Sequence, residues 1–226
     1  MAFVETEASK MKFLRRHWYD LGAVVALAVG AASFFLWRDM SPIQRVLLLN
    51  FIMMLAHQYE EYGWPGGFPP LVNLVVWPSN RPDRYPLNQN GAMVINLIWS
   101  YVFYLAPVFF PTVIWLALGP LLVGFLQVIA HGILTNVKLK ALYNPGMITA
   151  LLGFLPLGIY YIYLVQGFAT AWDWGMGFAY MAGFLYFGVL KLNFTWLSAE
   201  DSPYPFAPEE MRRFGFPDRA KRLAAQ

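Results

Sequence analysis

Long runs of apolar residues without a charged side chain constrain this chain more than any other feature. Between Gly91 and Asn136 there is no Asp, Glu, Lys or Arg. A helix that crosses a bilayer needs roughly 20 mostly apolar residues, so this stretch is long enough for two crossings. Of the 226 residues, 58% are apolar and only 13% are charged, and the charged share is about half that of ordinary soluble domains. The sequence therefore predicts an integral membrane protein.

Apolar runs bounded by charge, proline or glycine predict an all-α, polytopic bundle of about six transmembrane helices. Their approximate limits are residues 21–37, 43–62, two spans within 91–136, 147–166 and 175–192. Pro107 and Pro111 mark the expected break between the third and fourth spans, and Gly119-Pro120 is a competing place to turn. The first run also resembles a signal peptide, but its apolar residues continue past the small-residue patch, which favours an uncleaved anchor.

The distribution of basic residues predicts the orientation of the bundle. If the N-terminus is inside, 14 of the 16 Lys and Arg residues lie in inner segments, and only Arg38 and Arg45 lie outside. This positive-inside bias fits six spans with both termini cytoplasmic. We expect a cytoplasmic N-terminal segment (residues 1–20), one transmembrane domain (21–193) with a long cytoplasmic-side loop or lid (63–90), and an irregular cytoplasmic tail (194–226) that Tyr204 and Phe206 order in part. In a bacterium the membrane would be the inner or plasma membrane.

The second span carries ionisable groups that are costly inside a bilayer. Asn50, Met54, His57 and Glu61 fall on one narrow stripe of a helix, because each residue turns the helix by 100°. Glu60 lies about 60° to the side of His57. One helical face thus presents an imidazole and two carboxylates within little more than one turn.

Polar side chains of other spans are predicted to lie at the same depth. His131 falls on a stripe of the fourth span with Gln127 and Thr135, and Asn96 lies one turn before Ser100 in the third span. Even-numbered spans run inward and odd-numbered spans run outward, so these groups all lie near the inner membrane face, as do Asn144 and Thr149 near the start of the fifth span. We therefore expect a site within the bundle that opens toward the cytoplasm.

The segment His57-Gln58-Tyr59-Glu60-Glu61-Tyr62, with the following Trp64-Pro65-Gly66-Gly67-Phe68-Pro69, resembles the signature of HXXEE-domain membrane proteins. The resemblance extends over residues 43–166. It includes Tyr85-Pro86-Leu87, Asn96, His131, Tyr143-Asn144-Pro145-Gly146 and Thr149. It implies a polytopic membrane family of uncharacterised function whose motif looks like an active or metal site.

Two kinds of chemistry fit these residues. In the first, His57, His131 and one glutamate, Glu61, hold a divalent metal such as Zn, Fe or Mn, and the other glutamate, Glu60, acts as general base. Asn96 is a further candidate catalytic residue. Since the chain has no cysteine, only histidine and carboxylate are available as ligands. In the second, no metal is bound, and a glutamate with a raised pKa exchanges protons with a histidine.

Enzymatic activity on a lipophilic small molecule is the favoured function, either metal-dependent and hydrolase-like or of an acid–base isomerase or cyclase type. The alternatives are a small proton-coupled transporter and a non-catalytic lipid-binding membrane protein. No internal repeat is visible, which argues against a carrier. The net charge of +3 is too small to indicate a nucleic-acid partner, so the lipid bilayer is the expected partner. The oligomeric state is left open.

Overall fold

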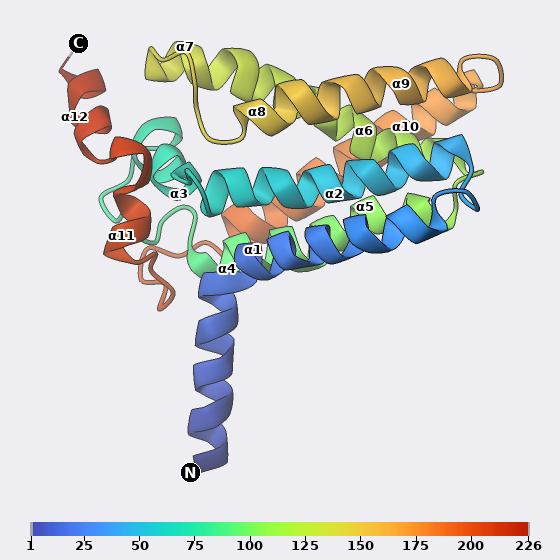
Figure 1. Ribbon diagram of the computed structural model, residues 1–226. Helices are drawn as coiled ribbons and strands as arrows, with labels where there is room; N and C mark the ends of the chain where they lie inside the picture. The colour runs from blue at the N-terminus through green and yellow to red at the C-terminus, as the bar shows by residue number, and fades with distance from the viewer. Residues whose placement is uncertain (1, 226) are drawn as a thin grey trace.

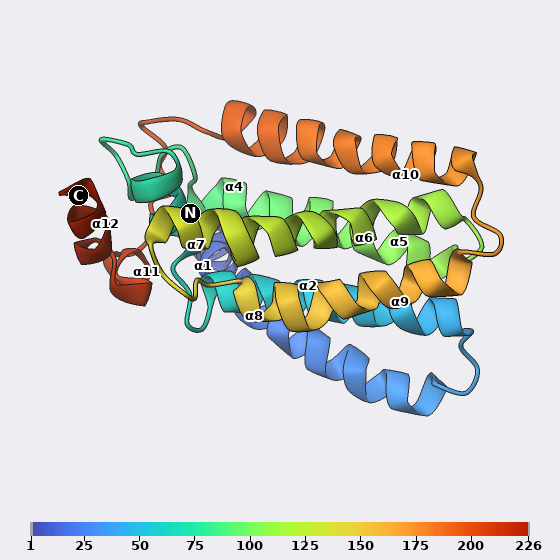
Figure 2. The same ribbon diagram turned by 90° about the horizontal axis from the view of Figure 1, so that it is seen from above.

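The computed structural model describes residues 2–225, with side chains described from residue 9 onward. Over these residues the chain forms helices and no β-strand, as predicted, and six long rods run antiparallel (Figures 1 and 2). The rods are α1 (Ala2–Leu36), α2 (Pro42–Tyr62), α4–η2–α5 (Gln89–Met93, Val94–Trp99 and Ser100–Phe109), α6–η3–α7 (Ile114–Ile129, Ala130–Leu134 and Thr135–Leu139), α8–η4–α9 (Met147–Thr149, Ala150–Phe154 and Leu155–Val165) and α10–η5 (Ala171–Gly183 and Phe184–Trp196). Each of these η segments is a π-helical stretch within a continuous rod.

Three short turns close one end of the bundle, while the longer connections and both termini lie at the other end (Figure 1). Two of the turns are fixed by capping boxes. The hydroxyl of Ser41, the residue before Pro42, accepts a hydrogen bond from the backbone N–H of Gln44. The hydroxyl of Thr170 accepts one from the backbone N–H of Asp173. Such caps satisfy backbone N–H groups that would otherwise lack a partner at a helix start.

The third turn lies between α5 and α6, at residues 110–113. This position agrees with the predicted break at Pro111. Pro107 lies within α5 and Pro120 lies within α6, so the chain does not use the competing turn at Gly119-Pro120.

Five helices are long and apolar enough to cross a membrane: Ser9–Leu36, Gln89–Phe109, Ile114–Leu139, Met147–Val165 and Ala171–Trp196. The helix α2 is not among them, because it carries the buried polar residues Asn50, His57, Glu60 and Glu61. It packs against α1, α5 and α9, so these groups face protein instead of lipid. A sixth crossing by α2 and a cytoplasmic location of both termini remain predictions.

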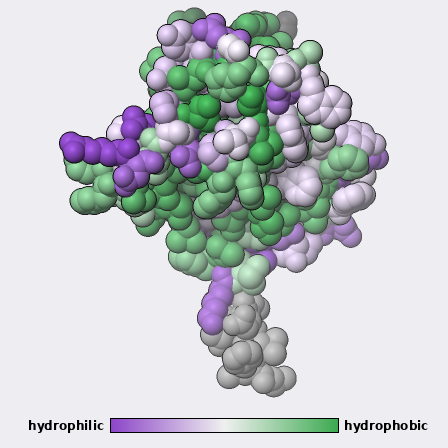
Figure 3. Space-filling view, turned by 90° about the vertical axis from the view of Figure 1, so that its right-hand side faces the viewer, coloured by the Kyte–Doolittle hydropathy of each residue, from purple (hydrophilic) through white to green (hydrophobic). Residues whose placement is uncertain are grey.

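The outer surface of the bundle is strongly apolar. Figure 3 views the molecule from the end with the three short turns, and hydrophobic residues cover much of this view. Large side chains such as Leu27, Phe34, Val102 and Leu152 are exposed on the outer faces of the helices. Exposed apolar surface of this extent is unfavourable in water and suits contact with lipid chains. The apolar helices therefore indicate an integral membrane protein.

The connection between α2 and α4, predicted as a loop or lid, is folded against the end of the bundle. It contains α3 (Phe68–Leu71) and η1 (Val72–Val76). Asn73 is fully buried and binds the backbone on the returning side, since its amide donates to the carbonyls of Pro82 and Leu87 and accepts the N–H of Leu87. These bonds hold η1 against the chain that leads into α4.

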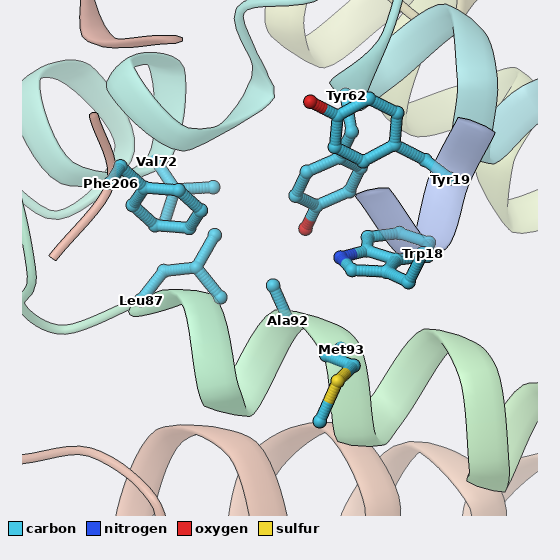
Figure 4. Close-up of a cluster of buried hydrophobic side chains, with 8 residues drawn as sticks. All are labelled: Trp18, Tyr19, Tyr62, Val72, Leu87, Ala92, Met93 and Phe206. Atoms are coloured by element: carbon cyan, nitrogen blue, oxygen red, sulfur yellow. The ribbon is translucent and has the colours of Figure 1, made fainter. Parts of the chain in front are cut away.

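A cluster of buried side chains joins this connection to α1, the end of α2 and the C-terminal tail (Figure 4). Its members are Trp18, Tyr19, Tyr62, Val72, Leu87, Ala92, Met93 and Phe206. The edge-on contact of Trp18 with Tyr62, at 4.8 Å between ring centroids, is a favoured aromatic geometry. The cluster fixes the end of α2, where the histidine and glutamates of the motif lie.

The C-terminal tail, expected to be irregular with partial order at Tyr204 and Phe206, is folded over most of its length. It forms α11 (Pro208–Met211), η6 (Arg213–Gly215) and α12 (Asp218–Ala224). Its backbone binds the long connection, with Tyr204 O accepting from Gln89 N and Phe206 N donating to Asp83 O. The buried carboxylate of Glu210 also accepts from the side chain of Gln89. The irregular extension expected after residue 194 is thus a folded cap on the bundle end.

Candidate functional site

Three predicted ligand residues meet in the interior of the bundle. His57 and Glu61 are one turn apart on α2, and His131 comes from η3. His57 Nε2 lies 3.6 Å and His131 Nε2 lies 3.3 Å from Glu61 Oε1. One ligand atom from each residue lies within 4.8 Å of the other two, and all three residues are buried. We refer to these three residues as the His–Glu cluster.

The ring of His131 is oriented by the connection between α7 and α8. His131 Nδ1 lies 2.7 Å from Asn144 Oδ1, and Asn144 Nδ2 donates to the carbonyl of His131 and to Asn136 Oδ1. Because the amide nitrogen of Asn144 already donates to these two acceptors, its oxygen must accept from His131. This assigns the ring proton to Nδ1. When this imidazole is neutral, the lone pair is therefore at Nε2, the atom that faces Glu61.

The ring of His57 is oriented in the same sense by a different residue. Its Nδ1 lies 2.8 Å from Thr149 Oγ1, and that hydroxyl donates to Glu60 Oε2 at 2.6 Å. A hydroxyl has one proton, so Thr149 accepts the proton of His57 Nδ1. His57 Nε2 is left as an acceptor, and it is buried without a hydrogen-bond partner.

Glu60, predicted as a catalytic base, faces away from the His–Glu cluster. Its two oxygens accept four hydrogen bonds, from the backbone N–H groups of Ile148 and Thr149 and from the hydroxyls of Thr149 and Tyr143. The carboxylate thus caps the start of α8, where the first N–H groups of a helix lack partners. It is absent from the residues that line the central cavity.

Tyr143 completes this arrangement from the connection between α7 and α8. Its hydroxyl lies 2.9 Å from Glu60 Oε1. Burial and the neighbouring Glu60 carboxylate raise the pKa of the Tyr143 phenol. The phenol therefore remains a neutral donor to Glu60 at physiological pH.

Gly146 permits the close approach of the two imidazoles to the start of α8. It has a positive φ of 100°, which other residues rarely adopt. A Cβ at this position would lie 2.7 Å from His131 Nδ1 and 2.9 Å from His57 Cε1. The rings of His57 and His131 meet edge to face, with centroids 5.0 Å apart. The absence of a side chain at Gly146 is therefore part of the geometry of the cluster.

A cavity of about 520 Å³ adjoins the His–Glu cluster, within the range of about 300–1,000 Å³ that is typical of small-molecule sites. Its walls are mainly apolar, with Met54, Tyr104, Val123, Phe154 and Phe184 among the lining residues. Glu61 and Lys138 are the two charged side chains among the described residues that line it. The cavity thus combines mainly apolar walls with several polar side chains, which include the His–Glu cluster, Gln127 and Lys138.

Asn96, the fourth predicted catalytic residue, lines the same cavity but is not in the His–Glu cluster. Its amide donates to the carbonyl of Ala92, and its oxygens accept from Gln58 Nε2. Gln58 Oε1 is buried without a partner. A catalytic role for Asn96 stays a prediction.

The sequence placed the ligand residues together but did not assign the residues that orient them. Asn144 and Thr149 carried two signals, a matching depth and a place in the extended motif. Neither signal showed which histidine each would bind. Gln58 and Gly146 lay within the motif, but no role could be assigned to them from the sequence.

The fold and the site define a class: a polytopic helical membrane protein with a buried cluster of two histidines and one carboxylate. Residues 48–161, slightly more than half of the chain, match the model of a family described as "Protein of unknown function with HXXEE motif". The chain belongs to this family, which confirms the resemblance seen at His57, Glu60 and Glu61. No curated protein matches the chain, and no solved structure does.

Proposed function

We propose that this protein is a membrane-embedded, metal-dependent enzyme that activates water for attack on a lipophilic substrate. The observation that carries the proposal is the orientation of the two imidazoles. His57 and His131 each use Nδ1 as a hydrogen-bond donor and direct the lone pair of Nε2 toward Glu61. With both imidazoles neutral, two lone pairs and a carboxylate meet without a proton donor and repel each other, and a cation between them would remove this repulsion.

The spacing of the three ligand atoms supports a metal site. Zinc binds histidine nitrogen and carboxylate oxygen at about 2.1 Å, and two ligands at the tetrahedral angle are then about 3.4 Å apart. The distances of 3.3 and 3.6 Å to Glu61 Oε1 are close to this value. Metal-bound histidines usually donate their other ring N–H to an acceptor, as Asn144 and Thr149 accept here. Zn therefore fits well, and Fe and Mn accept the same ligands.

Three protein ligands leave a fourth position for water, which is the usual arrangement of a catalytic zinc. A zinc ion held by these residues would supply Lewis acidity and would activate water as a nucleophile near neutral pH. In this scheme Glu61, His57 and His131 hold the metal. Glu60 positions His57 through Thr149 and is not the base, since its oxygens already accept four hydrogen bonds.

Elemental analysis of detergent-purified protein tests this proposal. We expect about one Zn, Fe or Mn per chain in the wild type and a loss in His57→Ala, Glu61→Gln and His131→Ala. His17→Ala is the matched control, because His17 lies outside the cluster and pairs with Asp20. Wild-type protein that is folded but takes up no metal, even after incubation with Zn²⁺, Fe²⁺ or Mn²⁺, would refute the metal site.

Acid–base catalysis without a metal is the second candidate, and the contact between His131 and Glu61 favours it. If one proton is shared at the 3.3 Å contact of Nε2 with Oε1, the pair can give and take protons in a dry site. This candidate predicts metal-free protein in which Glu61→Gln, but not His17→Ala, changes the binding of a lipophilic substrate. The elemental analysis therefore separates the two candidates.

A further inference from the structure

The cavity beside the His–Glu cluster lies where the last rod of the bundle changes its packing partner. In its first half, α10 packs on α6 through two glycines, Gly119 against the ring of Tyr180 and Gly177 against Leu118. Small residues of this kind let membrane helices approach closely. Figure 2 shows α10 near α6 at its start, and the rod then diverges from α7 toward the other end.

In its second half, the rod is held by a different part of the bundle. Gly188 of η5 faces the ring of Trp99 on η2, and Asn193 faces Gly91 on α4. The segment η5 therefore packs on η2 and α4, while the cavity lies between it and η3–α7. Leu134 lines the cavity from one side of this opening, and Val189 lines it from the other.

The opening is apolar and continuous with the outer surface of the bundle. Leu126 and Leu134 line the cavity, yet they are 37% and 61% exposed. The two residues lie on either side of His131 in the sequence. A side chain that both lines a cavity and faces outward marks a place where the wall is incomplete. The cavity wall is thus incomplete on the side of the bundle at the level of the His–Glu cluster, and it is also incomplete near the bundle end at Trp77, which lines the cavity and is 47% exposed.

The level of this opening corresponds to the hydrocarbon part of a bilayer. The rod Ile114–Leu139 has 26 residues, which makes it about 39 Å long at 1.5 Å per residue. The middle of the rod falls between Leu126 and Gln127, so His131 lies only about 7 Å from it along the axis. The hydrocarbon core extends about 15 Å to each side of its centre. If the rod is centred in the bilayer, lipid chains face the opening and water does not.

We propose that the substrate is a lipid with one long apolar chain, which enters the cavity sideways from the bilayer between η3–α7 and η5. The proposal rests on the function proposed above and names the substrate class for the same site. The chain occupies the apolar end formed by Met54, Val123 and Phe184. The polar head stays toward Thr135 and Lys138, near the end of the rod, and the reacting group lies between them at the cluster.

Photolabelling in vesicles tests the route. The probe is a long-chain fatty acid with a diazirine near its methyl end, added to phosphatidylcholine vesicles that contain the full-length protein. We expect label on peptides with Met54, Val123 or Phe184. Label at Leu27, which is exposed on α1, measures ordinary contact with bilayer lipid and serves to normalise the signal.

Two variants narrow the opening from opposite sides, Leu134→Trp and Val189→Trp. Each should lower the normalised cavity label about tenfold, equivalent to about 1.4 kcal/mol of binding free energy. The matched control is Ile133→Trp, because Ile133 is exposed beside Leu134 but does not line the cavity. The control should label like the wild type. If either Leu134→Trp or Val189→Trp fails to fold, the other variant still tests the route.

Metal content measured on the same samples separates this inference from the function on which it rests. Wild-type protein that holds metal but shows no label above the Leu27 level overturns the substrate class and leaves the metal site standing. Equal labelling in Leu134→Trp, Val189→Trp and Ile133→Trp overturns the sideways route. Strong cavity label in wild-type protein that takes up no metal, even after incubation with Zn²⁺, Fe²⁺ or Mn²⁺, refutes the metal-dependent function while supporting entry of the chain.

Discussion

Replacing Thr149 by valine removes one hydroxyl on which two buried groups depend. Thr149 Oγ1 accepts from His57 Nδ1 at 2.8 Å and donates to Glu60 Oε2 at 2.6 Å. Valine has nearly the same size and shape, so the substitution removes both hydrogen bonds with little change in volume. It therefore tests whether the orientation of His57 contributes to metal binding.

The expected magnitude follows from what His57 loses. A buried N–H without an acceptor costs about 1–3 kcal/mol. The ring can avoid this cost by moving its proton to Nε2, but it then loses the lone pair that faces Glu61. Removing the outer partner of a metal-binding histidine typically weakens metal affinity about 10–100-fold, or about 1.4–2.8 kcal/mol. Since the two estimates agree, we expect the metal affinity of Thr149→Val to be about 10–100-fold weaker than that of the wild type.

Zinc titration against a competing chelator in detergent measures this affinity. Thr149→Ser is the matched control: it keeps the hydroxyl, and its affinity should stay within about threefold of wild type, or about 0.6 kcal/mol. Folded Thr149→Val protein with wild-type affinity would refute the role assigned to the hydroxyl. Equal losses in the valine and serine variants would attribute the effect to packing instead.

Two further predictions concern the connection between α7 and α8. Gly146→Ala should destabilise the protein by at least about 1–3 kcal/mol in thermal unfolding, because a positive φ is strained for alanine and the new Cβ would lie 2.6 Å from His131. Gly30→Ala is the control, because a Cβ at Gly30 has nothing within 4 Å, and it should be neutral or stabilising. Equal melting temperatures of Gly146→Ala and Gly30→Ala would contradict this reasoning. Tyr143→Phe removes a donor to Glu60. Because the folded-state pKa of this phenol is raised, its stabilising contribution is complete below about pH 10 and falls as the pH rises above that value. The melting-temperature difference from wild type should therefore be constant at neutral pH and shrink above about pH 10, and a change around pH 7 would argue against it.

The convergence of His57, Glu61 and His131 was predictable because it follows from helical periodicity and depth. One stripe of α2 carries His57 and Glu61, and the second and fourth spans run in the same direction, which brings His131 to the same level. These arguments need only the rise and turn of a helix and the places where spans end. They do not need the conformation of any loop.

The different roles of the two adjacent glutamates were not predictable in this way. Neighbouring residues of a helix point about 100° apart, so periodicity shows that Glu60 and Glu61 face different neighbours without identifying them. The start of α8 lies next to Glu60, and backbone N–H groups of α8 donate hydrogen bonds to the Glu60 carboxylate. That placement depends on Gly146, whose positive φ belongs to an irregular connection with no period.

The extent of order in the C-terminal tail was not predictable for a related reason, since the sequence indicated only partial order at Tyr204 and Phe206. The residues after η5 form only short helices, and local patterns are weak in segments of this length. Their order comes from distant partners, such as Gln89 for Tyr204 and Asp83 for Phe206. Contacts over such sequence separations leave no periodic signal.

Whether α2 crosses the membrane decides the topology, and a chain without cysteine allows a direct test. The helix has 21 residues, or about 32 Å, which matches the hydrocarbon thickness of about 30 Å. Its low hydropathy does not argue against a crossing, because its polar groups bind other helices and do not meet lipid.

Single cysteines at the exposed positions Asp39, Asn80 and Ala199 report the side on which each segment lies. If α2 crosses, a membrane-impermeant maleimide added to intact cells should label Asp39→Cys alone, and all three variants should react after permeabilisation. The positive-inside bias of the sequence predicts this orientation, with Asn80 and Ala199 in the cytoplasm. Equal accessibility of Asp39 and Asn80 in intact cells would mean that α2 does not cross. In that case α2 would enter and leave the membrane on one face, or the His–Glu cluster would open to the side opposite the cytoplasmic side that the charge distribution predicts.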